Sequence, residues 1–184
     1  MQRDLVERAM AGDHGAFSEL ARASIGRLYA AARLILRDDG RAEDATQEAL
    51  VAAWRDLSAL RDPDRFDAWL HRLLVRACYR EARRGRRRWA IEMEIRPVEG
   101  SEPDPALDLA DRDQLERGFR RLDPDQRAVL VLHYYLGLSL DEVGYALGVP
   151  PGTVRSRLHR ATQAMRAALD ADTRHTTDIE RRPA

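Results

Sequence analysis

Cysteine is nearly absent from this sequence, since Cys78 is the only one among 184 residues. A single thiol can form neither a disulfide framework nor a cysteine-based metal cluster. No apolar run approaches the length of a membrane span and the N-terminus has no apolar signal core, so we expect a cytoplasmic protein without membrane insertion. No Ser/His/Asp arrangement or glycine-rich phosphate loop is recognisable, and we expect no catalytic residue, metal, cofactor or small-molecule substrate.

Sheet-forming patterns are missing too. Aromatic residues make up 6% of the chain, and no run of alternating β-branched residues occurs. Alanine, leucine, arginine and glutamate dominate instead, which favours helices. The sequence predicts an all-α fold of two small helical domains, residues 1–90 and 111–171, joined by an acidic flexible linker over residues 91–110. The polar, aperiodic residues 172–184 are expected to form a disordered tail.

Lysine is absent altogether, and all 31 basic residues are arginine. Their positive charges equal in number the negative charges of the 31 acidic residues. The two signs are separated along the chain. Between residues 71 and 90 there are eight arginines and one acid, whereas between residues 91 and 116 there are nine acids and two arginines. A basic block followed by an acidic one indicates a nucleic-acid surface next to a segment that avoids or imitates nucleic acid.

Residues 139–161 predict a helix-turn-helix. Ser139 and Glu142 form a capping box at the start of the first helix, which ends at Gly148, and a second helix begins near Gly152. An ordinary helical hairpin with a solvated arginine face is the alternative interpretation of this segment alone. The outward face of the second helix carries groups that hydrogen-bond base edges and phosphates in a major groove: Thr153, Arg155, Ser156, Arg157, His159 and Arg160.

A longer helix, from about Phe66 to Arg84, separates an apolar side from an arginine stripe. The apolar side is expected to face the core through Leu70, Leu73, Leu74 and Ala77. The stripe runs past the end of this helix and is suited to track a phosphate backbone: Arg72, Arg76, Arg80, Arg83 and Arg87. Tyr79 lies near the stripe and is a candidate for stacking on an unpaired base. The alternatives are solvated arginines and a tyrosine at the core or its rim.

Five further helices are expected from apolar spacing and capping signals. They cover residues 4–10, 14–36, 42–57, 107–122 and 124–137, and residues 37–40 form a turn. The helix over residues 42–57 places most of its acidic and amide side chains opposite its apolar side.

Four segments together resemble one family, the bacterial sigma factors of the extracytoplasmic-function (ECF) group. They are GDHGAFSEL at residues 12–20, AEDATQEALVAAW at 42–54, FDAWLHRLLVRACYREARRGRRR at 66–88 and LGLSLDEVGYALGVPPGTVRSRLHRA at 136–161. Their order and spacing make the resemblance specific. It implies two helical domains that both bind core RNA polymerase, each reading one element of promoter DNA.

The resemblance also implies roles for single residues. The helix from Phe66 to Arg88 would read and open the minus-ten element, and the acidic linker would run through the polymerase towards the RNA path. The helix from Gly152 would enter the major groove at the minus-35 element, where four contact positions match: Arg155, Ser156, His159 and Arg160. Three side chains would contact the clamp helices of core polymerase: Asp44, Gln47 and Glu48. An anti-sigma factor is a further candidate partner.

Three positions depart from the family pattern. Arg76 stands where an asparagine usually helps to capture a non-template base, and Arg80 where an acidic or amide residue is common. We therefore expect greater reliance on phosphate contacts at the minus-ten element. Gly144 stands where alanine is usual, which should weaken its helix by up to ~1 kcal/mol.

Two other classes of protein compete with this interpretation. An autonomous helix-turn-helix regulator that dimerises on a palindrome would show an apolar dimer stripe, and none is found beyond the residues assigned to cores. A nucleic-acid enzyme could use Asp38 with Asp39, or Glu43 with Asp44, as metal ligands, but adjacent side chains on a helix diverge in direction. The sequence favours a promoter-specificity subunit without catalytic activity.

Overall fold

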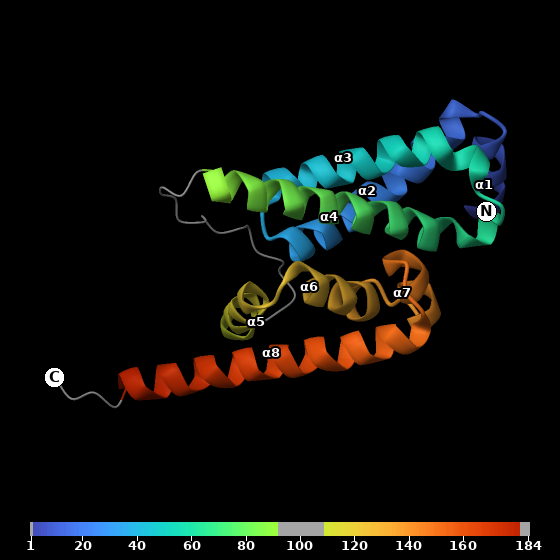
Figure 1. The fold of residues 1–184 in the computed structure, drawn as a ribbon. Coiled ribbons are helices and arrows are strands. Elements are labelled where there is room, and N and C mark those ends of the chain that lie inside the picture. The colour runs from blue at the N-terminus through green and yellow to red at the C-terminus, as the bar shows by residue number, and fades with distance from the viewer. Residues whose placement is uncertain (1, 92–108, 181–184) are drawn as a thin grey trace.

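The computed structural model describes residues 2–91 and 109–180, with side chains over residues 2–85 and 115–170. Every regular element in these ranges is helical and none is a strand, which confirms the all-α prediction. Figure 1 shows two helical domains, with the first four helices in an upper layer and the last four in a lower layer.

The first domain contains four helices. Its N-terminal caps follow from the sequence: the carboxylate of Asp13 accepts a hydrogen bond from the backbone N–H of Ala16 (3.0 Å) and so starts the second helix, as predicted. Two short 3₁₀ turns, Leu57–Ala59 and Pro63–Arg65, precede the last helix. The helices are α1 (Gln2–Met10), α2 (His14–Leu36), α3 (Asp39–Asp56) and α4 (Phe66–Ile91).

The turn expected at residues 37–40 is shorter in the structure. Arg37 adopts a left-handed conformation (φ 56°) that closes α2. The side chain of Asp38 then accepts a hydrogen bond from the N–H of Arg41 (2.8 Å), so α3 begins at Asp39 instead of residue 42. The sequence did contain a signal for this earlier start, because Asp38 is an aspartate and aspartate is a favoured N-cap residue.

The second domain also contains four helices. Asp123 forms a capping box with Gln126, which starts the second of these helices at Pro124, where the sequence predicts it. The helix expected over residues 124–137 is divided, because it passes into a π-helical turn at Val131–Tyr135. The helices are α5 (Leu109–Arg121), α6 (Pro124–Leu130), α7 (Leu140–Leu147) and α8 (Pro151–Glu180).

Two predicted boundaries at the ends of the domains need correction. Helix α4 continues to Ile91, and α8 continues to Glu180 through most of the predicted tail. No glycine or proline follows Gly152 before Pro183, so nothing in that part of the sequence stops α8. Residues 92–108, most of the predicted linker, and residues 181–184 lie outside the described residues.

Helix α4 is buried over a wider arc than its apolar pattern predicts. Besides the expected leucines, His71, Val75 and Cys78 are buried. The reason is that α4 packs on α2 and α3 with one side and on α7 of the second domain with another. Buried side chains of both domains therefore form one continuous core.

Candidate DNA and polymerase interfaces

The helix-turn-helix forms as its capping residues predict. The backbone N–H of Ser139 donates to the carboxylate of Glu142 (2.8 Å), and the N–H of Glu142 donates to the Ser139 hydroxyl (3.3 Å). The Ser139 hydroxyl also donates to the Glu142 carboxylate (2.7 Å), and this hydrogen bond, together with the one from the Ser139 N–H, holds the pKa of Glu142 below its ordinary value. Gly148 closes α7 in the left-handed region (φ 69°), where a side chain would be strained.

The predicted outward face of α8 is only partly open. Val154 and Ala161 are fully buried, so the rotation of the helix is as predicted. Four of the six predicted DNA-contacting residues are exposed: Arg155, Ser156, His159 and Arg160. Thr153 and Arg157 are half-buried.

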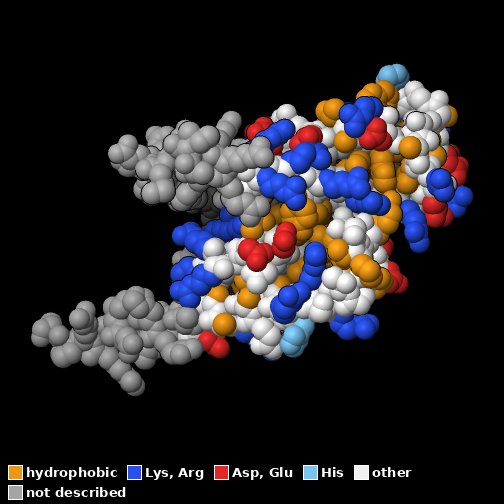
Figure 2. All heavy atoms as spheres, viewed as in Figure 1, with side chains coloured by type: hydrophobic (Ala, Val, Ile, Leu, Met, Phe, Trp, Pro, Cys, Tyr) orange, Lys and Arg blue, Asp and Glu red, His pale blue; other side chains and the backbone are white. Residues whose placement is uncertain are grey.

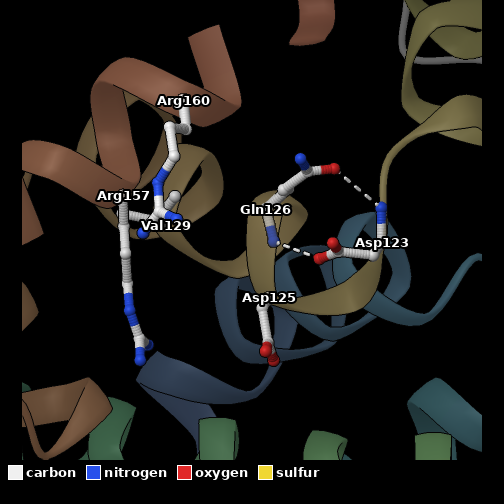
Figure 3. Close-up of a pocket in the computed structure, with 6 residues that line it drawn as sticks. All are labelled: Asp123, Asp125, Gln126, Val129, Arg157 and Arg160. Carbon is white, nitrogen blue, oxygen red and sulfur yellow. Dashed lines mark hydrogen bonds between the residues drawn. The ribbon is translucent and has the colours of Figure 1, made fainter.

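A pocket of about 250 Å³ lies between α8 and the start of α6. Figure 3 shows that Arg157 and Asp125 extend to the same side, towards the ribbon of the first domain. Two carboxylates, of Asp123 and Asp125, line this pocket together with the guanidinium groups of Arg157 and Arg160. The balanced charges do not suit a free phosphate, and all of the lining residues belong to the second domain.

The arginine stripe on α4 is confirmed in part. Figure 2 shows arginine side chains gathered over α4 on the face turned to the viewer. Arg76 and Arg83 are exposed, and Arg80 forms an ion pair with Glu48 of α3 (3.0 Å). Arg72 is half-buried, with its guanidinium carbon 4.7 Å from the ring centre of Tyr145 in α7. The side chain of Arg87 lies outside the described residues.

Tyr79 is turned partly towards the second domain. Its hydroxyl is buried and faces Asp125 and Arg157 of the second domain, and burial raises its pKa. Tyr79 as a whole is half-buried, as the alternative of a tyrosine at the rim of the core predicts. Sequence spacing within α4 could not reveal that a second domain covers this side chain.

A groove between α3 and α4 holds all three predicted polymerase-binding residues. Asp44, Gln47 and Glu48 line it together with Val51, Glu81 and Arg84. Val51 is 64% exposed and Trp54 is 39% exposed, an apolar pair that the sequence analysis missed. Their spacing from Gln47, four and seven residues along the helix, was the available signal. Carboxylates beside apolar side chains suit a basic amphipathic helix.

The described ranges contain neither a cluster of metal ligands nor a membrane-spanning helix. No group of three or more His, Cys, Asp or Glu side chains there could hold a metal ion. No helix within those ranges is long and apolar enough to cross a membrane.

Two family models match the chain: sigma-70 region 2 over residues 20–88, and sigma-70 region 4 over residues 112–165. SigM, an ECF RNA polymerase sigma factor of Mycobacterium tuberculosis, is 33% identical over 159 residues, which cover 86% of this chain and 79% of SigM. The chain belongs to the ECF sigma factors of the sigma-70 family. It is therefore a sigma factor that binds core RNA polymerase and directs it to promoter DNA.

Solved structures agree with this membership. CnrH, in complex with the cytosolic domain of CnrY, matches with a TM-score of 0.66 and 30% identity, covering 93% of this sigma factor and 98% of CnrH. The sigma factor RpoE from Bartonella quintana, in complex with the anti-sigma factor NepR, has the same fold. Its TM-score is 0.72 at 24% identity, over 85% of this chain and 98% of RpoE.

Proposed function

We propose that this sigma factor reads two promoter elements with two separate helices. Residues 1–90 would bind core polymerase and use α4 at the minus-ten element, and residues 111–171 would place α8 in the major groove at the minus-35 element. The observation that carries the proposal is the exposed polar face of α8 on a capped helix-turn-helix. Arginine, serine and histidine on such a face can donate hydrogen bonds to base edges.

The groove between α3 and α4 is the proposed site for core polymerase. It presents the carboxylates of Asp44 and Glu48 next to exposed Val51, a combination that favours a basic, partly apolar helix. Asp44 is exposed, whereas Glu48 is already engaged by Arg80. Asp44 is thus the acid most available to a partner.

Co-purification tests this site. Asp44→Arg should abolish or strongly reduce assembly with core polymerase, while thermal unfolding changes little because the side chain is exposed. Glu19→Arg, a charge reversal at an exposed position of α2 away from the groove, is the matched control and should assemble normally. Normal assembly of Asp44→Arg would remove the groove as the docking site.

Three further assignments complete the proposal. The chain would act in the cytoplasm, where core polymerase and promoter DNA are found, and would supply specificity without a catalytic step of its own. An anti-sigma factor would be its regulatory partner, by analogy with RpoE, which was solved in complex with one. No observation on the described residues favours the autonomous regulator.

A further inference from the structure

We propose that this sigma factor binds a small oxyanion of the phosphate type between the guanidinium groups of Arg37, Arg120 and Arg127. These side chains come from the C-terminal cap of α2, from α5 and from α6. None of them belongs to the residues proposed to contact promoter DNA or core polymerase. The inference therefore goes beyond the proposed function and does not depend on it.

The first observation is an unpaired guanidinium at Arg127. This side chain is half-buried, and its Nε is fully buried without a hydrogen-bond acceptor. Within the part of the chain that the structure describes, Arg127 forms no ion pair either. Buried charges in proteins are normally paired, and a buried polar atom without a partner is the feature that a bound ion would complete.

The second observation is that two neighbouring guanidinium groups share one carboxylate. Arg37 Nη2 lies 3.8 Å and Arg120 Nη2 lies 3.6 Å from Oε2 of Glu116. Both distances exceed that of an ordinary hydrogen bond, so this carboxylate leaves donors of both arginines available. Arg37 also donates from Nη1 to the backbone carbonyl of Glu116 (3.2 Å), which fixes its guanidinium between α2 and α5.

The third observation is that these cations lie close enough to repel one another. Burial and then the charge of Arg37 lower the pKa of Arg127 to about 10, although Asp123 opposes this shift. Burial also lowers the pKa of Arg37, where Glu116 opposes the shift and Arg120 adds to it. All three groups stay protonated at neutral pH, so an anion between them would relieve the repulsion.

The donor groups indicate the class of ligand. A guanidinium presents pairs of N–H donors in a plane, which match two oxygens of a phosphate group. Three cations stand beside two carboxylates here, those of Glu116 and Asp123, so one positive charge is left over. A phosphate group, with about 1.5 to 2 negative charges at neutral pH, suits this small excess better than a polyphosphate does.

Thermal unfolding and calorimetry of the full chain test the site. Unfolding is followed at pH 7.5 in sodium phosphate and in sodium chloride of the same ionic strength. Phosphate stabilises many proteins without occupying a site, so the wild type is compared with Arg127→Met, which removes the guanidinium and keeps a long side chain. Arg22→Met removes an exposed arginine of α2 outside the cluster and is the matched control. Isothermal titration calorimetry with inorganic phosphate measures the stoichiometry.

We expect one phosphate per chain. At ten times the dissociation constant, phosphate should raise the Tm of the wild type and of Arg22→Met by about 3–5 °C more than chloride does. Arg127→Met should lose this gain, and in chloride it should melt no lower than the wild type, because an unpaired charge has been removed. A purely structural arginine would instead lower the Tm in both salts. Arg120→Gln, at an exposed position, should weaken phosphate binding roughly three-fold or more.

Absence of a binding heat in the wild type, or equal gains in Tm for the wild type and Arg127→Met, would overturn the proposal. So would an Arg127→Met variant that binds phosphate normally but binds a random-sequence DNA duplex less tightly, because the guanidinium would then serve DNA. If Arg127→Met does not fold, Arg120→Gln takes its place in the comparison. Neither measurement includes polymerase, so failure here leaves the proposed function standing, and failure of transcription leaves the anion site standing.

Discussion

At the scale of single residues, the structure explains why Gly144 stands where the family usually has alanine. The N–H of Val149 donates to the Gly144 carbonyl (2.9 Å), which curls the turn back over α7. A Cβ on Gly144 would lie 2.8 Å from the backbone oxygen of Val149. Helix propensity alone predicts that glycine weakens α7. The backbone oxygen of Val149, however, occupies the space that the Cβ of an alanine would need.

We therefore predict opposite effects for two glycine-to-alanine substitutions. Gly144→Ala should destabilise the protein by about 1 kcal/mol. The free energy needed to shift the backbone away from the new Cβ exceeds the gain in helix propensity from glycine to alanine. Gly26→Ala, in an exposed turn of α2 with nothing within 4 Å of the added Cβ, should stabilise it by about 0.5–1 kcal/mol. Thermal unfolding followed by circular dichroism measures both, and a stabilised Gly144→Ala would contradict the close contact.

Capping residues were the part of the structure most readable from sequence. Helices α2, α6 and α7 start where the sequence predicts, because the side chains of Asp13, Asp123 and Ser139 each accept a hydrogen bond from a backbone N–H three residues on. Arg80 shows the limit of this local information. Its ion-pair partner Glu48 is 32 positions away along the chain, so the helical spacing within α4 could not predict this ion pair.

At the scale of elements, α8 and α4 should contact DNA in different ways. Arg155 is exposed on a helix suited to the major groove, so Arg155→Ala should cost about 1–3 kcal/mol and relax specificity at defined minus-35 positions. Arg83 is exposed on the stripe of α4. Arg83→Ala should weaken holoenzyme binding about equally on all promoters and lower the magnitude of the log–log salt slope by about one unit.

Holoenzyme binding to a promoter library at several salt concentrations distinguishes these two kinds of contact. Arg22→Ala, on α2 away from both helices, controls for the loss of a positive charge. A uniform loss on all promoters for Arg155→Ala would place that side chain on phosphate and would contradict direct base readout.

At the scale of the whole molecule, the contact between the domains was beyond the reach of sequence patterns. The composition and the periodicity predicted two helical domains, but the side of α4 that meets the second domain carries His71, Arg72 and Tyr79, which form no apolar pattern. Tertiary packing decided their burial. The same packing explains why Tyr79 and Arg157 are less accessible than the helical pattern predicts.

His71 makes this contact sensitive to pH. Burial lowers its pKa below the ordinary 6.5, and the groups facing it are Asp67 and Glu142, which raise the pKa, and Arg27, which lowers it. A depressed histidine pKa means that the unfolded chain binds more protons. The stabilisation from neutral His71 is therefore complete above 6.5 and is lost as pH falls through the lower folded value.

We predict that the free energy of unfolding falls between about pH 7.5 and about pH 5.5, and falls less in His71→Gln. Urea unfolding at a series of pH values measures both curves. Other groups contribute equally to both curves, so the difference between the two proteins is the relevant quantity. Parallel curves would show that His71 takes no part in the pH dependence.

Reconstituted transcription tests the central claim most directly. Core RNA polymerase is mixed with the purified chain and a library of promoter fragments, and run-off products are sequenced. We predict transcripts only when both proteins are present, from fragments that share two upstream elements at one spacing. The account would be contradicted if the chain neither co-purified with core polymerase nor produced transcripts, while by itself it bound a palindromic duplex tightly as a dimer.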